Sequence, residues 1–473
     1  MTYIPPPGSI PTLDVPDLEG IKRVHMIGIG GAGMSGIALL LLAAGIEVTG
    51  SDLKDSYGLG GLRAAGARIE VGHRADHLGD PDAVVVSSAI PETNPELAEA
   101  RRRGLPVFAR AQVLASLARG RRSFAVTGTH GKTTTTSMLA VILERAGLDP
   151  SYSIGGDLNE SGSNARAGGG NVFVAEADES DGSFLLLAGD VGIVTNIEED
   201  HLDFYRGGEA EIREAFATFM DRCVTVIAGG DDEGVRAAAA LSTATPLLYG
   251  LGEYSDVRLT VRDPDGWDAE GTLDIGGQDV DLRLRVPGVH NLLNATAALL
   301  AAREAGVDPA EAAEALAAFS GVRRRFEYRG SGGGAEFFDD YAHHPTEIAA
   351  TLAAAARRAG HERLLAVFQP HRYTRTQSMW RDLGESLAEA DVVVVTDVYA
   401  AGEEPIPGVS GKLLVDALAG TGWPHRLVYL PRRRDVVRFL SDETRSGDLV
   451  LTLGAGDITV VADETLERIR EEP

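Results

Sequence analysis

The sequence predicts an α/β protein of three domains, each built around a mostly parallel sheet. Three stretches share one order, a short β-branched strand, a glycine-rich turn and an Ala/Leu-rich helix, which is typical of parallel α/β sheets. They begin near residues 24, 123 and 323. The 473 residues also exceed one ordinary core, since domains average about 150 residues. We therefore expect three Rossmann-like domains, over residues 1–121, 122–321 and 322–473.

The composition indicates a globular protein and excludes several classes of partner. The chain carries 44 basic and 70 acidic side chains, a net charge of −26, which opposes nonspecific binding to nucleic acid or anionic lipid. Its single cysteine, Cys223, permits no intramolecular disulfide, and the N-terminus lacks the pattern of a signal peptide. No strongly apolar run reaches the ~20 residues that cross a bilayer. We expect a cytoplasmic protein that binds neither nucleic acid nor a membrane.

The first motif is the glycine turn GIGGAG, from Gly28 to Gly33, which follows the strand VHMI and opens a helix. Glycines there permit a tight turn and let the backbone approach a pyrophosphate at the helix N-terminus. Asp52 ends the next strand, where such folds place an acid beside a ribose or base. This context favours a nucleotide diphosphate site over a turn that is merely tight, but it does not identify the nucleotide.

The second motif is the phosphate-loop sequence TGTHGKT at residues 127–133, again between a strand and a helix. Val126 takes the place of the first glycine of the standard motif, so the loop is a shorter variant. The chemistry still fits: backbone N–H groups cradle phosphate, Lys132 reaches the β- and γ-phosphates, and Thr133 binds Mg²⁺. A compact ammonium fits such a loop where a planar guanidinium does not. Lysine is otherwise rare in this chain, occurring at only four positions: Lys22, Lys54, Lys132 and Lys412.

Carboxylate and imidazole groups follow two later strands of the second domain. Glu176 ends the strand FVAE, and Asp200 and His201 follow the strand GIVTNI. Both positions lie at the carboxyl ends of expected parallel strands, the edge at which open α/β sheets bind ligands. They suit a second divalent ion near the phosphates. For Glu176 the metal role outweighs that of a helix cap, whereas His201 is equally well explained by a hydrogen bond within a turn.

Five further segments of the second and third domains carry informative patterns. Residues 152–170, rich in Gly, Ser and Asn, predict a long loop at a site, and residues 257–286 alternate polar and apolar positions as antiparallel strands do. In HNLLN, residues 290–294, Asn291 could be a helix N-cap, or His290 and Asn294 could contact an adenine; spacing favours neither. DDYAHHP (339–345) and QPHRYTR (369–375) gather ionisable residues on loops, which favours a site.

Taken together, these motifs resemble those of the Mur ligase family, the ATP-dependent enzymes that assemble the peptide of the bacterial cell-wall precursor. The resemblance covers essentially the whole chain and depends on five ordered motifs: GTHGKTT, EADESD with EEDH, HNLLNATAA, RRRFE and DDYAHHPTE. IGIGGAGMSGIA, YAHHPTEI and FQPHRYTRT are most similar to the branch that adds L-alanine to UDP-N-acetylmuramate. Several relatives in other branches carry a carbamylated lysine after the Asp-His motif, and the absence of lysine between Lys132 and Lys412 supports the alanine-adding branch.

The resemblance implies roles for the matching residues. The UDP-linked substrate would be held by Gly28, Gly30, Gly31, Ala32, Gly33, Asp52, His73, Ser87 and Ser88. ATP would be bound by Gly128, Thr129, His130, Gly131, Lys132, Thr133, Thr134, His290, Asn294, Arg325 and Asp340. Mg²⁺ would be held by Thr133, Glu176 and His201. The amino acid would be framed by Tyr341, His371, Arg372 and Arg375, and the catalytic set would be Lys132, Glu176, His201, His343 and Arg375.

The resemblance also implies a reaction. The carboxylate of the UDP-linked substrate would attack the γ-phosphate of ATP, Lys132, Arg325 and Mg²⁺ would stabilise the resulting acyl phosphate, and the amine of alanine would displace phosphate. The sequence does not identify the base that deprotonates this amine; His343 and His201 are the candidates. The oligomeric state is left open between monomer and homodimer.

Three alternatives remain at this point. A related ligase attaches a ready-made peptide to the same UDP-sugar for recycling and would share the fold and the ATP site. An NAD-dependent oxidoreductase would explain the glycine turn and Asp52 but not the central phosphate loop. A regulatory ATP-binding module without catalysis is disfavoured by Glu176, His201 and the histidines of the third domain.

Overall fold

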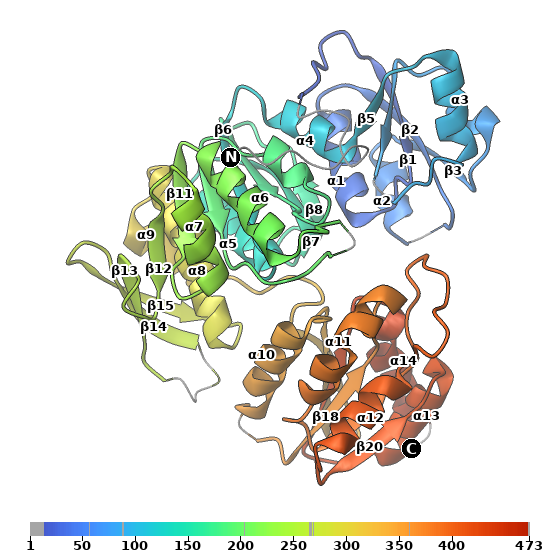
Figure 1. Ribbon diagram of the computed structural model, residues 1–473, viewed down its shortest axis with the longest axis vertical. Coiled ribbons are helices and arrows are strands. Elements are labelled where there is room, and N and C mark those ends of the chain that lie inside the picture. The colour runs from blue at the N-terminus through green and yellow to red at the C-terminus, as the bar shows by residue number, and fades with distance from the viewer. Residues whose placement is uncertain are drawn as a thin grey trace. The chain divides into compact units, whose positions relative to one another are not determined.

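The computed structural model describes residues 14–55, 57–87, 89–202, 204–263, 267, 269–358 and 360–471. The chain forms two compact units. The first comprises Met1–Arg262, Glu270–Arg283 and Asn291–Phe319, and the second comprises Asp263–Ala269, Leu284–His290 and Ser320–Pro473. Three mostly parallel sheets with helices between their strands confirm the predicted α/β class (Figure 1). The boundaries of three domains near residues 121 and 321 stay a prediction.

The first unit contains a five-stranded parallel sheet that carries the glycine turn. Its strands are ordered β3-β2-β1-β4-β5. They are β1 (Arg23–Ile27), β2 (Glu47–Asp52), β3 (Arg68–Val71), β4 (Ala83–Val86) and β5 (Val107–Ala109). The helices are α1 (Ala32–Ala43), α2 (Tyr57–Ala64), α3 (Pro95–Arg103) and α4 (Arg110–Ala118). Because β1 is central, the turn that follows it opens at the middle of the sheet edge, between β2 and β4.

The same unit contains a ten-stranded sheet that carries the phosphate loop. Its order is β15-β14-β13-β12-β11-β10-β6-β9-β7-β8. The strands are β6 (Arg122–Thr127), β7 (Ser151–Leu158), β8 (Ser163–Arg166), β9 (Val172–Glu176), β10 (Val191–Val194), β11 (Thr225–Gly229), β12 (Leu247–Gly250), β13 (Val257–Val261), β14 (Ala269–Asp274) and β15 (Asp279–Leu284). The helices are α5 (Lys132–Arg145), α6 (Glu209–Asp221), α7 (Glu233–Leu241), α8 (Val289–Glu304) and α9 (Pro309–Ala317).

Two sequence predictions for this sheet have different outcomes. The alternating segment 257–286 forms β13, β14 and β15 at one end of the sheet, with β13 antiparallel to β14, which confirms that prediction. The prediction of a long loop over residues 152–170 is wrong. That segment contains most of β7 and all of β8, an antiparallel pair whose β7 adds in parallel to β9. Pairing with β9 supplies the strand with partners that its Gly- and Ser-rich composition did not indicate.

One continuous hydrophobic core joins the two sheets of the first unit. Helix α1 is apolar on all sides, which is typical of a helix buried on all sides. It packs against α2 and α4 of its own layer and against β7 and β8 of the ten-stranded sheet. At Gly36 an added Cβ would lie 3.1 Å from Cβ of Ala165, so a small residue is needed at this crossing. No described helix is long and apolar enough to cross a membrane.

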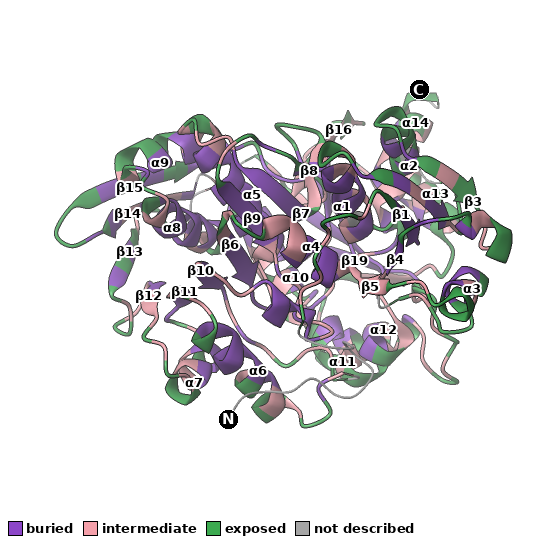
Figure 2. Cartoon of the chain, turned by 90° about the horizontal axis from the view of Figure 1, so that it is seen from above, coloured by how far each residue is buried: buried purple, intermediate pink, exposed green. Residues whose placement is uncertain are grey.

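The helix that follows the phosphate loop is buried along most of its length. All residues of α5 from Thr133 to Leu143 are buried (Figure 2). The helix packs against β6, β7, β9 and α9. Its first turn is therefore fixed at the edge of the sheet.

The second unit is a six-stranded sheet covered by helices on both faces. The order is β16-β17-β21-β18-β19-β20, with β16 antiparallel to β17 and the remaining pairs parallel. The strands are β16 (Glu327–Gly332), β17 (Ala335–Asp340), β18 (Arg363–Phe368), β19 (Val392–Val395), β20 (Arg426–Tyr429) and β21 (Asp448–Leu453). The helices are α10 (Pro345–Ala356), α11 (Tyr373–Glu385), α12 (Lys412–Gly420), α13 (Arg433–Glu443) and α14 (Val461–Glu471).

Alternate residues of the central strand β18 enter two separate cores. Leu364, Ala366 and Phe368 pack with residues of α10, α11 and α12, whereas Leu365 and Val367 pack with residues of α13 and α14. This period of two places both faces of the strand in apolar surroundings, as expected for a parallel strand between two helix layers. The carboxyl ends of β17 and β18 therefore lie at the same edge of the sheet, one on each side of β21.

A buried polar network supports the glycine turn from within the five-stranded sheet. His25 of β1 and Glu96 of α3 are both fully buried, with His25 Nε2 3.0 Å from Glu96 Oε2. Glu96 also accepts hydrogen bonds from the Ser51 hydroxyl and the Arg74 N–H. Burial raises the pKa of Glu96, but these hydrogen bonds outweigh it and hold the pKa below its ordinary value. The network ties the strand that ends at Asp52 to the core.

Removing this carboxylate is expected to destabilise the protein. In Glu96→Ala the buried polar groups of His25 and Ser51 lose their partner, and such a loss costs about 3 kcal/mol or more. Glu92→Ala breaks only the exposed pair with Arg101 and should change the free energy of unfolding by about 0.5 kcal/mol or less. Urea unfolding measures both variants. Because the pKa of Glu96 is depressed, its contribution should be present above the ordinary carboxyl range and lost as the pH falls; equal stability of the two variants at pH 7 would contradict this account.

Candidate active site

The phosphate loop is held in shape by two asparagines from distant elements. It joins β6 to α5, with Gly128 at φ 128° and Gly131 at φ 80°. A Cβ on Gly131 would collide with Oδ1 of Asn294, so glycine is needed for space as well as for conformation. The Oδ1 of Asn294 also accepts a hydrogen bond from Thr135 at 3.3 Å, and the His130 N–H donates to Asn196 Oδ1 at 2.8 Å. The loop is therefore preformed.

The start of α8 decides one alternative for the HNLLN segment. The helix begins at Val289, so Asn291 is its third residue and the N-cap role is wrong. Asn294 lies against the phosphate loop through the contacts with Gly131 and Thr135. His290 is the second residue of the helix. The nucleotide-binding roles of His290 and Asn294 stay predictions.

Lys132 uses all three donors of its ammonium, two within the loop and one on an acid that follows β9. Nζ donates to the carbonyls of Gly128 at 2.6 Å and Thr129 at 3.1 Å, and to Glu179 Oε1 at 2.9 Å. Burial acts to lower the pKa of Lys132, but the carboxylates of Glu179, Asp178 and Glu176 raise it above its ordinary value. The side chain is therefore a fixed positive charge at the mouth of the loop.

The structure brings together two of the three residues predicted to hold Mg²⁺. Thr133 Oγ1 donates to Glu176 Oε1 at 3.2 Å, and the Gly155 N–H donates to Glu176 Oε2 at 2.7 Å. Hydroxyl and carboxylate oxygens are the ligands that Mg²⁺ prefers, so this pair fits the ion. His201, at φ 54°, lies with its Nε2 3.5 Å from Asp200 Oδ2. Its metal role stays a prediction.

A second acid of the EADESD run, missed by the sequence analysis, lies beside Lys132. Glu179 is buried, and its Oε2 has no hydrogen-bond partner among the described residues. Burial raises the pKa of Glu179 to about 7; Lys132 opposes this shift and Asp178 adds to it. The sequence signal was the density of acids directly after β9, of which only Glu176 was assigned.

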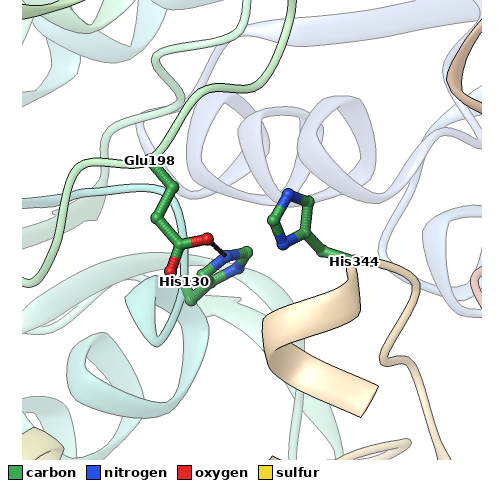
Figure 3. A group of neighbouring side chains, drawn as sticks. All are labelled: His130, Glu198 and His344. Carbon is green, nitrogen blue, oxygen red and sulfur yellow. Dashed lines mark ion pairs between the residues drawn. The ribbon is translucent and has the colours of Figure 1, made fainter. Parts of the chain in front are cut away.

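His130 and Glu198 form a further polar pair at the loop (Figure 3). His130 Nε2 lies 3.5 Å from Glu198 Oε2, and both side chains are partly buried. The Glu198 N–H donates to Thr129 Oγ1 at 2.8 Å. These contacts tie the predicted ATP-binding residues Thr129 and His130 to the segment that follows β10. Thr134, also predicted to bind ATP, is buried in the first turn of α5.

The glycine turn of the first sheet is shaped by Asp52 and Ser51. The Gly28 and Ile29 N–H groups donate to the Ser51 carbonyl, and the Gly30 N–H donates to Asp52 Oδ2 at 2.9 Å. A Cβ on Gly30 would lie 2.9 Å from that same oxygen, so the approach requires glycine. His73 Nδ1 lies 2.9 Å from Ser51 Oγ, which places His73 beside the turn as well.

Of the remaining residues predicted for the UDP site, some are placed by the structure and one lies outside the described residues. Ser87 directly follows β4, the neighbour of β1, at the same edge of the sheet. Ser88 lies outside the described residues. Gly31 caps the N-terminus of α1, in which Ala32 and Gly33 form the first turn.

A cavity of about 200 Å³ lies between the two sheets of the first unit. The lining includes Gly33 of α1, Arg110 of α4, Ser153 and Gly155 of β7, and the acids Glu176 and Asp178. Residues next to the glycine turn and residues next to the phosphate loop therefore line one shared cavity. Arg110 was not predicted, because nothing in the local sequence FARAQ distinguishes a site arginine from a helix-starting one.

In the second unit, Asp340 organises the loop that carries Arg325. Its two oxygens accept the N–H groups of Phe326 and Ala342, each at 2.7 Å. Burial raises the pKa of Asp340 to about 6, with Arg325 opposing. The Arg325 guanidinium lies 5.3 Å from the centre of the Tyr341 ring. Three residues with predicted roles in ATP or amino-acid binding thus meet at the end of β17.

Aromatic rings from three loops form a continuous row beside this point. Neighbouring ring centres are 5.3 Å apart for Tyr341 and His343, 5.9 Å for His343 and His371, and 5.7 Å for His371 and Tyr399. Burial, together with Arg375 and Arg372, lowers the pKa of His371 to about 4. The imidazole is therefore neutral at pH 7. Tyr399 was missed, because it comes from a loop distant in sequence.

The two arginines of the FQPHRYTRT motif are held differently. Arg372, at φ 70°, donates from Nε to Glu403 Oε1 at 2.7 Å. Arg375 lies in the first turn of α11 and is buried. The structure therefore brings Tyr341, His343 and His371 together, and Arg372 and Arg375 belong to the same segment as His371. The amino-acid-binding roles of these residues stay predictions.

Comparison with known proteins gives full-length matches. Three family descriptions match in order: "Mur ligase family, catalytic domain" at residues 23–122, "Mur ligase middle domain" at 126–302, and "Mur ligase, glutamate ligase domain" at 324–456. A UDP-N-acetylmuramate–L-alanine ligase of Mycobacterium sp. (strain JLS) is 48% identical and one of Kineococcus radiotolerans 49% identical. The alignments cover 96% and 95% of this chain, and 96% and 97% of those relatives.

Two solved structures are similar over almost the whole chain. The UDP-N-acetylmuramate-alanine ligase of Thermotoga maritima is 31% identical with a TM-score of 0.82, and the match covers 95% of this chain and 100% of that one. A murein peptide ligase of Psychrobacter arcticus is 26% identical with a TM-score of 0.72, covering 95% and 99%.

The raised pKa of Glu179 predicts a pH-dependent difference in stability between the parent and Glu179→Gln. With a folded pKa of about 7 and an ordinary value of 4.5, the carboxyl contributes stability that is present below pH 4.5 and lost as the pH rises through 7. Lys132 stays charged throughout. Between pH 4.5 and 7.5 the parent should lose on the order of 3 kcal/mol relative to Glu179→Gln.

Urea unfolding at each pH measures this difference. Glu199→Gln, which changes an exposed acid of the same unit, is the matched control and should show no such divergence from the parent. Parallel curves for the parent and Glu179→Gln across this range would contradict the raised pKa.

Proposed function

The chain belongs to the Mur ligase family, and from this premise we propose that it joins L-alanine to the lactyl carboxylate of UDP-N-acetylmuramate, using ATP, in peptidoglycan precursor synthesis. It is an enzyme, a ligase that forms an amide bond. The observation that carries the substrate assignment is the match of 95% or more of the chain to relatives that bear the name of this activity. We expect it to act in the cytoplasm as a monomer or homodimer.

The phosphate loop supports ATP as the energy source. The N–H groups at the start of α5 point to the loop mouth, and Lys132 supplies a fixed positive charge there. Thr133 and Glu176 are the residues that would hold Mg²⁺, with His201 as a further candidate. The bound ion would offset charge on the phosphates. Around it, Lys132 stabilises the negative charge that develops as the γ-phosphoryl group is transferred.

The cavity between the two sheets supports a carboxylate acceptor. It is lined by Gly33 beside the glycine turn, where the UDP part is expected, and by Glu176 on the phosphate-loop side. The substrate carboxylate attacks the γ-phosphate, which gives an acyl phosphate and ADP. The amine of alanine then attacks the acyl carbon, phosphate leaves, and the amine proton passes to a base. Arg375 is assigned to the carboxylate of alanine.

The peptide-recycling ligase is the second candidate, because the Psychrobacter arcticus murein peptide ligase is also similar over the whole chain. The Thermotoga maritima alanine ligase is the more similar of the two in both identity and TM-score. The oxidoreductase alternative is not favoured, since it leaves the phosphate loop and the family match unexplained.

The proposal is tested by ADP release with UDP-N-acetylmuramate and each amino acid or peptide in turn. We expect release to depend on L-alanine and to yield an amide product. Hydroxylamine added without alanine should trap a hydroxamate of the UDP-sugar. Release with tripeptide but not with alanine would establish the recycling activity instead, and full ligation without any trapped hydroxamate would contradict the acyl phosphate.

Lys132→Arg is expected to lose most of its activity although it keeps the charge. The ammonium fits between the carbonyls of Gly128 and Thr129, where the larger planar guanidinium does not fit. We expect kcat to fall by about two orders of magnitude, the loss typical when a group that stabilises transition-state charge is misplaced. Lys412→Arg, at an exposed lysine paired with Asp416, is the matched control and should keep parental kcat. A Lys132→Arg enzyme within a few-fold of the parent would show that this loop does not bind ATP.

A further inference from the structure

Arg110 is the only basic side chain among the described residues that line the cavity between the two sheets. It is the first residue of α4 and projects toward the acidic run after β9. Its Nη2 lies 2.6 Å from Asp178 Oδ2. The other charged residues of the lining are Glu176 and Asp178, so the cavity without Arg110 would be purely acidic.

The guanidinium also lies directly against the first turn of α1. A Cβ on Gly33 would collide with Nη1 of Arg110, so the last glycine of the GIGGAG turn is needed for the arginine to pass. Arg110 therefore touches both halves of the cavity. On one side is the helix N-terminus expected to receive a diphosphate, and on the other is the acidic run beside the phosphate loop.

Most of its hydrogen-bonding capacity is uncommitted within the described residues. A guanidinium has five N–H donors, and one hydrogen bond is made, to Asp178. A residue serving only to anchor α4 would be expected to use its fork on both oxygens of the carboxylate, as Arg363 does with Asp448. The remaining donors of Arg110 are available to a second anion.

The negative charge of the expected substrate requires a cationic group in the cavity. UDP-N-acetylmuramate brings a diphosphate and a carboxylate to a protein with a net charge of −26. Two like charges 4 Å apart at an effective dielectric near 20 disfavour binding by roughly a thousandfold. A metal ion bound at Glu176 would leave the negative charge of Asp178 unbalanced. Arg110 is the cation in contact with Asp178.

We propose that Arg110 is a substrate-binding residue whose guanidinium takes an anionic group of the UDP-linked substrate, exchanging or sharing its contact with Asp178. This inference rests on the proposed function. It links the UDP site to the ATP site through one side chain: an anion bound at Arg110 lies between the N-terminus of α1 and the carboxylates beside Lys132. The anion is either the diphosphate or the lactyl carboxylate, which the ligands below distinguish.

Calorimetric binding to the full-length protein tests the proposal with three ligands: UDP, UDP-N-acetylglucosamine and UDP-N-acetylmuramate. We expect Arg110→Ala to weaken UDP-N-acetylmuramate at least tenfold and Arg110→Lys to weaken it less, because lysine keeps the charge but not the fork. A loss confined to UDP-N-acetylmuramate assigns the guanidinium to the carboxylate, and a loss shared by all three ligands assigns it to the diphosphate. Arg119→Ala, which removes an exposed charge beyond the other end of α4, should bind as the parent does.

The double variant Arg110→Ala/Asp178→Asn separates direct contact from charge balance. If the guanidinium contacts the substrate, binding stays weak after the acid is neutralised, and Asp178→Asn alone binds at least as tightly as the parent. Recovery of parental affinity in the double variant would overturn the proposal, since Arg110 would then serve only to neutralise Asp178. Parental affinity in Arg110→Ala and Arg110→Lys would also overturn it.

Kinetics and melting temperatures complete the test. The KM for the UDP-substrate should rise in Arg110→Lys while the KM for ATP stays within about threefold, a split that a general loss of folding would not produce. Ligation of alanine by the parent together with unchanged binding in the Arg110 variants would refute this inference alone. Failure of the parent to bind or ligate UDP-N-acetylmuramate would refute the proposed function itself.

Discussion

The balance of charge around Lys132 is the constraint on which the candidate site depends. Three acids of one short run, Glu176, Asp178 and Glu179, face a single ammonium, which donates to two carbonyls of the loop and to Glu179. Carboxylates that leave water are tolerated only when they are paired or protonated. Lys132 forms an ion pair with Glu179, and Arg110 forms one with Asp178. Glu176 accepts hydrogen bonds from the Thr133 hydroxyl and the Gly155 N–H.

Close approach of backbone and side chain is the second constraint, and it explains why glycine recurs at the site. Asp52 needs Gly30, Arg110 needs Gly33, Asn294 needs Gly131, and Glu176 needs Gly155, because in each case a Cβ would occupy the space of the functional atom. The glycines thus mark where a polar group from another element reaches the phosphate-binding backbone. In GIGGAG and TGTHGK the glycines therefore do more than permit a turn: they provide the space into which the polar groups enter.

Local patterns predicted the α/β class, the two strand-turn-helix motifs and the antiparallel strands β13 and β14, because each depends on residues within one segment. The hairpin of β7 and β8 could not be predicted this way, since its Gly- and Ser-rich sequence is stabilised by pairing with β9 and packing on α1. Arg110 and Asp178 are separated by 68 positions, and Lys132 and Glu179 by 47. Such pairs carry no local signature, so the sequence indicated Lys132, Thr133 and Glu176 but not Arg110, Asp178 or Glu179.

The charges around the histidines of the second unit bear on which group deprotonates the alanine amine. His371 has a pKa of about 4, so at neutral pH roughly one molecule in a thousand carries the proton, and an acceptor so weakly basic gains little from removing a proton from an ammonium. Because its imidazole is neutral, His371 adds no further positive charge near Arg372 and Arg375. Such a charge would repel the substrate amine. His343 lies next in the ring row, with its Nδ1 3.1 Å from the Tyr341 carbonyl and 3.4 Å from Glu347 Oε2. Of the histidines in this row, His371 is therefore the one whose surroundings argue against a role as the base, so His343, and His201 beside Asp200 in the first unit, stay the predicted candidates.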